Sequence, residues 1–224
     1  MTALIDTWSA NPKEDDSMTD GHAWIWHEMI RTSAATDLTQ AKVLDVGCNQ
    51  GGFLRLLYDA RPFAQGVGVD LARDRVALAN EAKGQRPITY IATAHPADAA
   101  QDFDLAFSHE VIYLVEDLEA HAASVAAALK PHAIYDAVTC CHADNPLWDR
   151  WHPMISSFSN IPVPSHTVAD IQSAFRAAGF DVSVSRFLAN AYIPTQPASA
   201  YFPTELDLLE TYTKWKLCFR CQKR

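Results

Sequence analysis

The sequence predicts a doubly wound α/β fold: a seven-stranded, mostly parallel sheet with an antiparallel last strand, formed by one domain that spans all 224 residues. Short apolar runs typical of buried strands alternate with segments of helical periodicity, at a spacing that favours right-handed crossovers and a sheet covered on both faces. The last two expected strands lack a long, strongly periodic helix between them, so the final strand should run antiparallel. With 49% hydrophobic residues, the chain can bury a sizeable core.

The elements are expected in a regular order along the chain. We expect strands at 43–46, 66–70, 87–92, 102–108, 133–140, 181–188 and 214–222, and helices at 21–36, 51–57, 73–82, 117–129, 167–178 and 205–212. Residues 1–36 should form a polar N-terminal arm followed by a cap helix. Residues 142–166, rich in Pro and Trp, are too long for a plain link, which predicts a lid or substrate-binding insertion.

The charge and cysteine content disfavour several classes of protein. A net charge of -9 and an isoelectric point near 5.4 disfavour nucleic-acid binding, which needs a surplus of Lys and Arg. The first residues lack the features of a signal peptide, and no apolar run approaches the length that spans a membrane. Five cysteines, an odd number, indicate reduced thiols and not a disulfide framework. These features predict a cytoplasmic protein whose partner is a small molecule.

The centre of the sequence is residues 42–53, KVLDVGCNQGGF: an apolar strand with an acid, a glycine-rich turn and the start of an amphipathic helix. A strand that turns through glycines into a helix points backbone N–H groups and the positive end of the helix dipole at one spot. Such a spot suits a ligand with polar or anionic groups. Asn49 stands where a further glycine is usual, and Asn tolerates left-handed backbone conformations better than most residues.

Two nucleotide-binding patterns fit this turn with one substitution each. Gly47-x-Asn49-x-x-Gly52 fits the dinucleotide-binding pattern GxGxxG. Asp45 followed by Gly47, Asn49 and Gly51 fits the methyl-donor pattern of an acid before GxGxG. Asp45 favours the second pattern, because a carboxylate just ahead of the turn repels a pyrophosphate and attracts the α-ammonium of a methionine-like group, as in S-adenosylmethionine.

With these motifs the chain resembles, over most of its length, a class I S-adenosylmethionine-dependent methyltransferase of the small-molecule type. The resemblance rests on VLDVGCNQGG, GVGVD, FDLAFSHEVIYLVED, ALKPHAIYDAV and AAGFDVSVSRF in combination. It implies S-adenosylmethionine as the cofactor, with the turn at its methionine end and Asp70 at its ribose hydroxyls. The cofactor-binding residues that it implies are Asp45, Gly47, Cys48, Asn49, Gly51, Asp70, Leu71, Ala94, His95 and Ser108. Ala94 and His95 stand where many members carry an acid for the adenine amino group, so here the chain departs from the pattern.

The carboxyl end of the fourth strand should face the cleft in such a fold. His109 and Glu110 lie there and are the candidate catalytic residues, since either can remove a proton from a methyl acceptor. His109 can instead simply line the donor site. A base is not required, because methyl transfer from a sulfonium depends mainly on in-line positioning of donor and acceptor.

The acceptor pocket is predicted from tryptophans and histidines. Trp24 and Trp26 lie two residues apart on the cap helix and cannot share a face, so one should pack on the core while the other covers something. The predicted substrate-binding residues are Trp24, His142, Trp148, Trp151 and His152, which suit a small aromatic or cationic acceptor. The tryptophans of the insertion can alternatively form a hydrophobic plug at the end of the sheet.

Three other hypotheses stay open at this level: an NAD-type oxidoreductase, a non-catalytic donor-binding module of the same fold, and a metal or metalloid site. The last rests on Cys140-Cys141-His142 and Cys218-x-x-Cys221, which the expected topology places on adjacent antiparallel strands. Buried free thiols are the simpler interpretation, because neighbouring strand residues point to opposite faces and cannot all bind one ion. We therefore predict no metal. The oligomeric state does not follow from the sequence.

Overall fold

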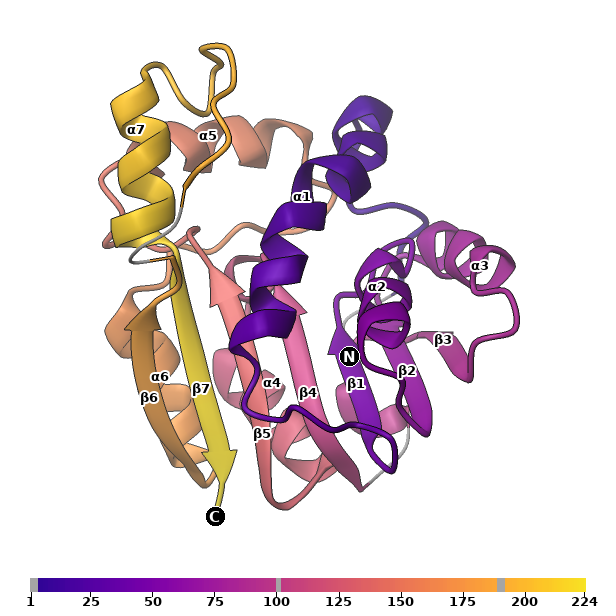
Figure 1. The fold of residues 1–224 in the computed structure, drawn as a ribbon. Coiled ribbons are helices and arrows are strands. Elements are labelled where there is room, and N and C mark those ends of the chain that lie inside the picture. Colours follow the sequence, from indigo (N-terminus) through magenta and orange to yellow (C-terminus); the bar gives the residue numbers. More distant parts are fainter. Residues whose placement is uncertain (1–3, 100–101, 189–191) are drawn as a thin grey trace.

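The computed structural model describes residues 4–99, 102–188 and 192–224. Within them, seven strands form one sheet in the order β3-β2-β1-β4-β5-β7-β6 (Figure 1). The strands are β1 Lys42–Val46, β2 Gln65–Asp70, β3 Ile88–Ala92, β4 Phe103–His109, β5 Leu129–Thr139, β6 Phe180–Arg186 and β7 Leu217–Lys223. Neighbours pair in parallel except β7, which is antiparallel to both β5 and β6. The predicted fold is confirmed, including its antiparallel last strand.

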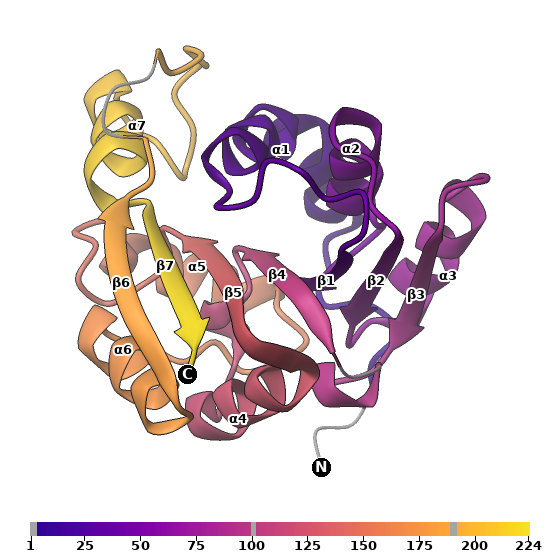
Figure 2. The same cartoon turned by 60° about the horizontal axis from the view of Figure 1, so that its bottom comes forward.

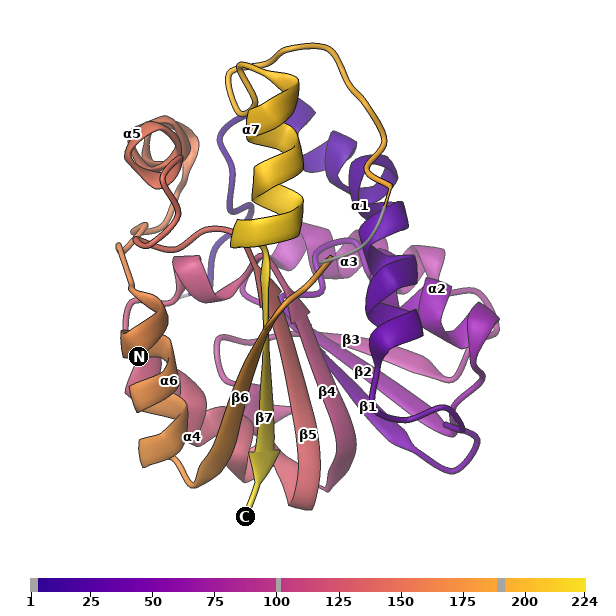
Figure 3. The ribbon, with the colours of Figure 1, turned by 60° about the vertical axis from the view of Figure 1, so that its left-hand side comes forward.

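Helices cover both faces of the sheet. One face carries α1 Pro12–Thr32, α2 Gly52–Ala60 and α3 Arg73–Ala82, and the other carries α4 Leu118–Ala128 and α6 Val168–Ala177 (Figures 2 and 3). α5 Trp148–Phe158 and α7 Glu205–Glu210 lie beyond the edge at which the parallel strands end (Figure 3). Short turns are η1 Pro96–Asp98, η2 Ile112–Leu114 and η3 Thr211–Trp215. No helix among the described residues is long and apolar enough to cross a bilayer.

Alternation along the central strands divides the core into two layers. Val43 of β1 packs in the cluster that includes residues of α1 and α2, and its neighbour Leu44 packs in the cluster that includes residues of α4 and α6. Both side chains are buried, because successive strand residues point to opposite faces and both faces are covered. A third cluster around Trp148, Trp151 and Ile155 lies beyond the strand ends and joins α5 to the segment that precedes α7.

α1 is longer at its start than the sequence predicted. It begins at Pro12 and not at Gly21, and it ends at Thr32, a few residues before the predicted end. Residues 12–20 are almost entirely polar, so no apolar stripe marks them as helical. Proline at a first helical position is nevertheless favourable, because its missing N–H would have no partner there.

The N-terminal arm, residues 4–11 of the described chain, is attached to the body of the protein. Ile5 forms a bridge with Ala72 after β2, and Ser9 forms a bridge with Ser159 after α5. Between these bridges, the ring of Trp8 packs edge-on against Phe158 at 6.0 Å. The arm therefore closes over the edge at which β1 and β2 end.

The sequence misplaced the start of β5, and the predicted insertion 142–166 contains a helix, α5. β5 begins at Leu129 and not at residue 133. Its ladder with β4 changes register between Phe103 and Leu105, and His132 has a φ of 66°, which together indicate a β-bulge. Such a bulge accommodates Pro131, which has no N–H for the ladder. The sequence also predicts a Pro-containing loop at 189–202, of which residues 189–191 lie outside the described chain.

Candidate functional site

The turn after β1 has the left-handed backbone that its sequence predicted. Gly47, Asn49 and Gly51 have φ values of 75°, 45° and 72°. A Cβ at Gly47 would lie 2.3 Å from the side chain of Val111, so a larger residue does not fit unless the Val111 side chain moves. Asn49 occupies the position where the pattern has glycine, and it accepts the left-handed conformation that this position needs.

Three backbone N–H groups of the turn are committed inside the protein. Gly47 and Cys48 both donate to the carbonyl of Val69 in β2, at 2.8 and 3.0 Å, and Asn49 donates to the Asp70 carboxylate at 2.8 Å. The sequence predicted several free N–H groups at this turn, but these three are hydrogen-bonded within the protein. The hydrogen bonds fix the turn to the end of β2. Because these N–H groups already have partners, ligand contacts depend more on the acids beside the turn.

Two acids from neighbouring strands lie against the turn. Asp45 of β1 is buried, and its Oδ2 has no hydrogen-bond partner among the described residues. Burial, together with the charge of Asp70, raises the pKa of Asp45 to about 8. Asp70 at the end of β2 accepts hydrogen bonds from the N–H groups of Asn49 and Ala72, at 2.8 and 2.9 Å. A cationic group beside Asp45 would provide the partner that this carboxylate lacks.

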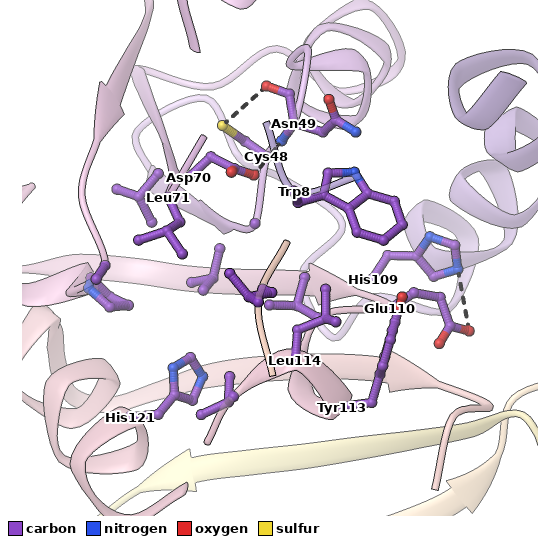
Figure 4. A pocket seen from close by; sticks show the side chains of 18 of the residues that line it. Trp8, Cys48, Asn49, Asp70, Leu71, His109, Glu110, Tyr113, Leu114 and His121 are labelled. Carbon is purple, nitrogen blue, oxygen red and sulfur yellow. Dashed lines mark hydrogen bonds and ion pairs between the residues drawn. The ribbon is translucent and has the colours of Figure 1, made fainter. Parts of the chain in front are cut away.

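A cavity of about 940 Å³ lies at the carboxyl ends of β1, β2 and β4 (Figure 4). The predicted site residues that line it are Asp45, Gly47, Cys48, Asn49, Asp70, Leu71, Ala94, His95, His109 and Glu110. Two predicted cofactor residues are absent from its lining. Gly51 accepts a hydrogen bond from the Tyr90 hydroxyl at 2.8 Å, and the buried Ser108 hydroxyl pairs with that of Tyr135 at 2.7 Å.

The part of the cavity next to η1 lacks a carboxylate at the position where the sequence pattern departs from the family. Leu71, Ala94 and His95 line it, while Asp98 does not and instead accepts a hydrogen bond from the Thr93 hydroxyl at 2.9 Å. The Thr93 hydroxyl also accepts from the His95 N–H at 3.0 Å. Thr93 and His95 are thus polar residues that follow β3 in the lining.

Glu110 lies directly after β4 at the other end of the cavity (Figure 4), with an unusual φ of 53°. Its carboxylate accepts hydrogen bonds from the Thr139 hydroxyl at 2.7 Å, from the Cys140 N–H at 3.0 Å, and from the ammonium of buried Lys216. Burial alone would raise the pKa of Glu110, but the Lys216 charge and these hydrogen bonds hold it well below the usual range. Glu110 therefore stays ionised, and its oxygens are fully engaged.

His109 is buried between α1 and Glu110. Its Nδ1 accepts a hydrogen bond from the Trp26 indole N–H at 3.3 Å, and its Nε2 has no partner among the described residues. Burial, with the Lys216 charge and the neighbouring His22, lowers the pKa of His109 well below its usual value. The imidazole is therefore neutral near pH 7 and is a weak base.

The predicted substrate-binding residues lie outside the cavity lining. Trp148 and Trp151 are buried in the third core cluster, where their indole N–H groups donate to Ser165 Oγ and Tyr201 O at 2.8 and 2.9 Å. His142 and His152 pair with the carbonyls of Trp215 and Val163. Trp24 packs edge-on against Tyr212 at 4.9 Å. The hydrophobic-plug alternative describes Trp148 and Trp151 better than pocket walls, because α5 buries them against the segment before α7.

The aromatic walls of the cavity come from other residues. Trp8, Trp26, Phe53 and Tyr113 line it. The sequence separated Trp24 and Trp26 onto two faces of the cap helix, and the structure places Trp26, not the predicted Trp24, in the lining. Lys216 gave no signal, since the Glu110 that it neutralises lies 106 residues earlier in the chain.

The cysteines do not meet as the topology suggested. Cys218 pairs in register with Val138. Within the described chain, the donor atoms that cluster are those of Glu110, Cys140 and Cys141, within 4.8 Å of one another, and Cys218 is not among them. Lys216 already neutralises Glu110, so a cation at this group would compete with an ammonium. All five thiols are free.

Comparison with known proteins gives a family and a fold. A family model described as a methyltransferase domain matches residues 22–183. No curated protein matches the sequence. The chain solved in complex with the Haloferax volcanii Trm112 methyltransferase activator is 22% identical, with a TM-score of 0.79 over 100% of this chain and 98% of that one.

Two further solved structures share the fold. An S-adenosylmethionine-dependent methyltransferase from Mesorhizobium loti is 20% identical, with a TM-score of 0.62 over 92% of this chain and all of that one. A Haemonchus contortus phosphoethanolamine N-methyltransferase, solved with S-adenosylmethionine, is 15% identical, with a TM-score of 0.62 over 93% of this chain and 57% of that one. At these identities the likeness concerns the fold.

Proposed function

The chain belongs to the methyltransferase-domain family, as its resemblance to class I S-adenosylmethionine-dependent methyltransferases predicted, and from this premise we propose that it methylates a small molecule in the cytosol. The observation that carries the proposal is that Asp45, whose buried Oδ2 has no hydrogen-bond partner within the described part of the chain, and Asp70 line one cavity. The oxidoreductase hypothesis does not agree with this family membership.

The residues present fit the donor of this family. Asp45 would bind the α-ammonium of S-adenosylmethionine, and Asp70 would bind the ribose hydroxyls next to Leu71. Ala94 and His95 would face the adenine. When bound, the donor supplies an electrophilic methyl group on a sulfonium. The tie between Asn49 and Asp70 couples the turn to the ribose position, so the two parts of this donor site are held as one unit.

The acceptor would bind at the end of the cavity where His22, Trp26, His109 and Tyr113 contribute to the lining. A volume of about 940 Å³ suits a donor plus a small molecule, and aromatic walls favour an apolar or aromatic acceptor. A formal charge of -9 disfavours a polyanionic acceptor.

Neither candidate catalytic residue is arranged as a strong base. The Glu110 oxygens are engaged by Lys216 and Thr139, and burial makes His109 weakly basic. We therefore propose that catalysis rests on in-line positioning of donor and acceptor, with Glu110 anchoring the loop after β4 and His109 facing the acceptor.

Donor binding followed by turnover tests this function. We expect S-adenosylmethionine to bind by calorimetry, and Asp70→Ala to weaken it by about 2 kcal/mol or more, because two hydrogen bonds to a charged group are lost. Formation of S-adenosylhomocysteine with a panel of small aromatic and amine acceptors would then identify the substrate. Tight NAD binding without S-adenosylmethionine binding would refute the proposal. Donor binding without turnover on a broad panel would favour the non-catalytic module.

A second candidate is action in complex with an activator protein. It is supported by the Haloferax neighbour, which was solved with the Trm112 activator and matches this chain over its whole length. Two leucines of α7, Leu206 and Leu209, are 61% and 45% exposed and so are accessible to a partner protein. Co-elution with a Trm112-type protein, and its effect on turnover, would test this. Separate elution at micromolar concentrations would count against it.

A further inference from the structure

One polar contact of the cavity lining decides the chemical state of His109. Trp26, on α1, donates its indole N–H to His109 Nδ1 at 3.3 Å. An indole N–H is a donor only, so Nδ1 must present its lone pair to it. A neutral imidazole carries its one proton on the other nitrogen. In the contact with Trp26, neutral His109 therefore carries its proton on Nε2.

The groups around His109 keep it in this neutral state. The ammonium of Lys216 lies nearby, paired with Glu110, and the ring of His22 packs edge-on against that of His109 at 4.7 Å. Burial and the Lys216 charge oppose a second proton on His109, and Glu110, with Oε1 4.0 Å from Nε2, offsets them only in part because Lys216 already neutralises it. The contact with Trp26 also engages the lone pair that a base would need.

We propose that Trp26 is a positioning residue: its indole N–H holds His109 as the Nε2–H tautomer, with the Nε2 proton directed toward Glu110 and the basic lone pair withheld from the acceptor. This inference rests on the proposed function, since it assigns His109 a place at the acceptor end of the cavity. It further implies a substrate class: the acceptor must bring a nucleophilic atom that needs no deprotonation by His109.

Two features of α1 strengthen the assignment. Trp26 is itself held in place, because its ring packs edge-on against Phe53 of α2 at 6.4 Å and lies 6.2 Å from His22, one helical turn earlier. Trp24, two residues away on the same helix, packs against Tyr212 and is absent from the cavity lining. The two tryptophans therefore provide a matched pair, one with the contact to His109 and one without it.

Nitrogen NMR of protein labelled with ¹⁵N-histidine, saturated with S-adenosylhomocysteine at pH 7, tests the proposal directly. Long-range proton–nitrogen correlations distinguish the two tautomers, and His109→Gln assigns the signal. We expect a protonated Nε2 and an unprotonated, hydrogen-bonded Nδ1 in the native protein. Trp26→Phe, which keeps a ring but removes the donor, should lose the hydrogen-bond shift of Nδ1 and the single tautomer. Trp24→Phe should leave the signal unchanged.

Two results would overturn the proposal: a protonated Nδ1 in the native protein, or a Trp26→Phe spectrum identical to the native one. The first needs no variant, so the test stands even if Trp26→Phe does not fold. The experiment also distinguishes failure of the proposed function from failure of the His109 tautomer assignment. Failure to bind S-adenosylhomocysteine would remove the proposed function without changing the tautomer in the free protein, whereas a wrong tautomer would leave donor binding intact.

Discussion

At the scale of single residues, Asp45 is a carboxylate whose charge depends on a ligand. Burial and the charge of Asp70 raise its pKa to about 8, so near pH 7 the free protein holds it mostly protonated. An ammonium beside it would favour the ionised form and return the pKa toward its ordinary value. Ligand binding and proton release are therefore linked at this residue.

We predict that S-adenosylhomocysteine binding at pH 7 releases close to one proton from Asp45, since a group with a pKa of about 8 is mostly protonated there. Calorimetry in phosphate and in Tris, whose ionisation enthalpies differ, would measure the release. Asp45→Asn should bind S-adenosylhomocysteine more weakly. Its binding heat should differ less between the two buffers, because residue 45 then has no proton to release. Equal heats in both buffers for the native protein would contradict the assignment.

Asp45, Asn49 and Asp70 of the cavity lining could be selected from the sequence because each belongs to a local pattern. Asp45 lies in β1 and Asp70 ends β2, strands that their apolar runs reveal, and Asn49 follows β1. The carboxyl ends of parallel strands meet at one edge of the sheet. Trp26 and Lys216 could not be selected in this way. Which face of a helix meets the cavity depends on how the helix is rotated, and the Lys216 contact joins distant parts of the chain.

At the scale of elements, the buried pair of Glu110 and Lys216 joins the end of β4 to the start of β7. The contact also includes Thr139 of β5, so three strands meet at one carboxylate. Such a pair need not stabilise the fold more than apolar residues would, but breaking it leaves a buried charge. Because the pKa of Glu110 is held below its usual value, its contribution is present at neutral pH and is lost as acid protonates it.

We predict that Lys216→Met lowers the free energy of unfolding by about 3–5 kcal/mol, because it leaves the Glu110 carboxylate uncompensated. Adding Glu110→Gln in the same chain should recover a large part of the loss. Urea denaturation at pH 7 would measure both. Lys130→Met is the control, since its pair with Asp104 is partly exposed and should cost about 1 kcal/mol or less. Equal losses for the two lysine variants would contradict the prediction.

α5 offers a second test at this scale, because the sequence predicts that its tryptophans line the acceptor pocket. Trp151 is 2% exposed and packs against Phe202 at 5.8 Å. We predict that Trp151→Ala costs about 3–5 kcal/mol of stability, the usual range for a buried aromatic, and leaves the donor affinity of the folded protein unchanged. Trp8→Ala, which changes the cavity lining, should weaken ligand binding with a smaller loss of stability. A large rise in the KM for the acceptor in Trp151→Ala, with donor affinity unchanged, would restore the original interpretation.

Most element boundaries followed from periodicity, and the failures have identifiable causes. α3 begins and ends where its pattern predicted, and Thr167 caps α6 with a full capping box. The start of α1 is polar and gives no periodic signal, and the start of β5 is concealed by the bulge at Pro131. At β5 the bulge in its ladder with β4, and not the local pattern, decides the boundary.

At the scale of the whole molecule, the cavity lies between parts that are distant in sequence. The N-terminal arm, α1, the turn after β1 and the loops after β2, β3 and β4 all contribute to its lining. A ligand that contacts all of them stabilises the folded protein against the unfolded chain, which has no such site. The shift of the unfolding transition that each candidate ligand causes therefore reports how well that ligand fits the cavity.

We predict that S-adenosylhomocysteine at 100 times its dissociation constant stabilises the protein by about 2.7 kcal/mol, which corresponds to a rise in Tm of roughly 5–10 °C for a chain of this size. NAD shares the adenosine half but carries no ammonium for Asp45, so it should give a much smaller rise at the same concentration. Asp70→Ala should lose most of the response to S-adenosylhomocysteine at that concentration, whereas Trp24→Phe should keep it. An equal rise with NAD would mean that the cavity recognises the adenosine alone, and the role of Asp45 in selecting the donor would be wrong.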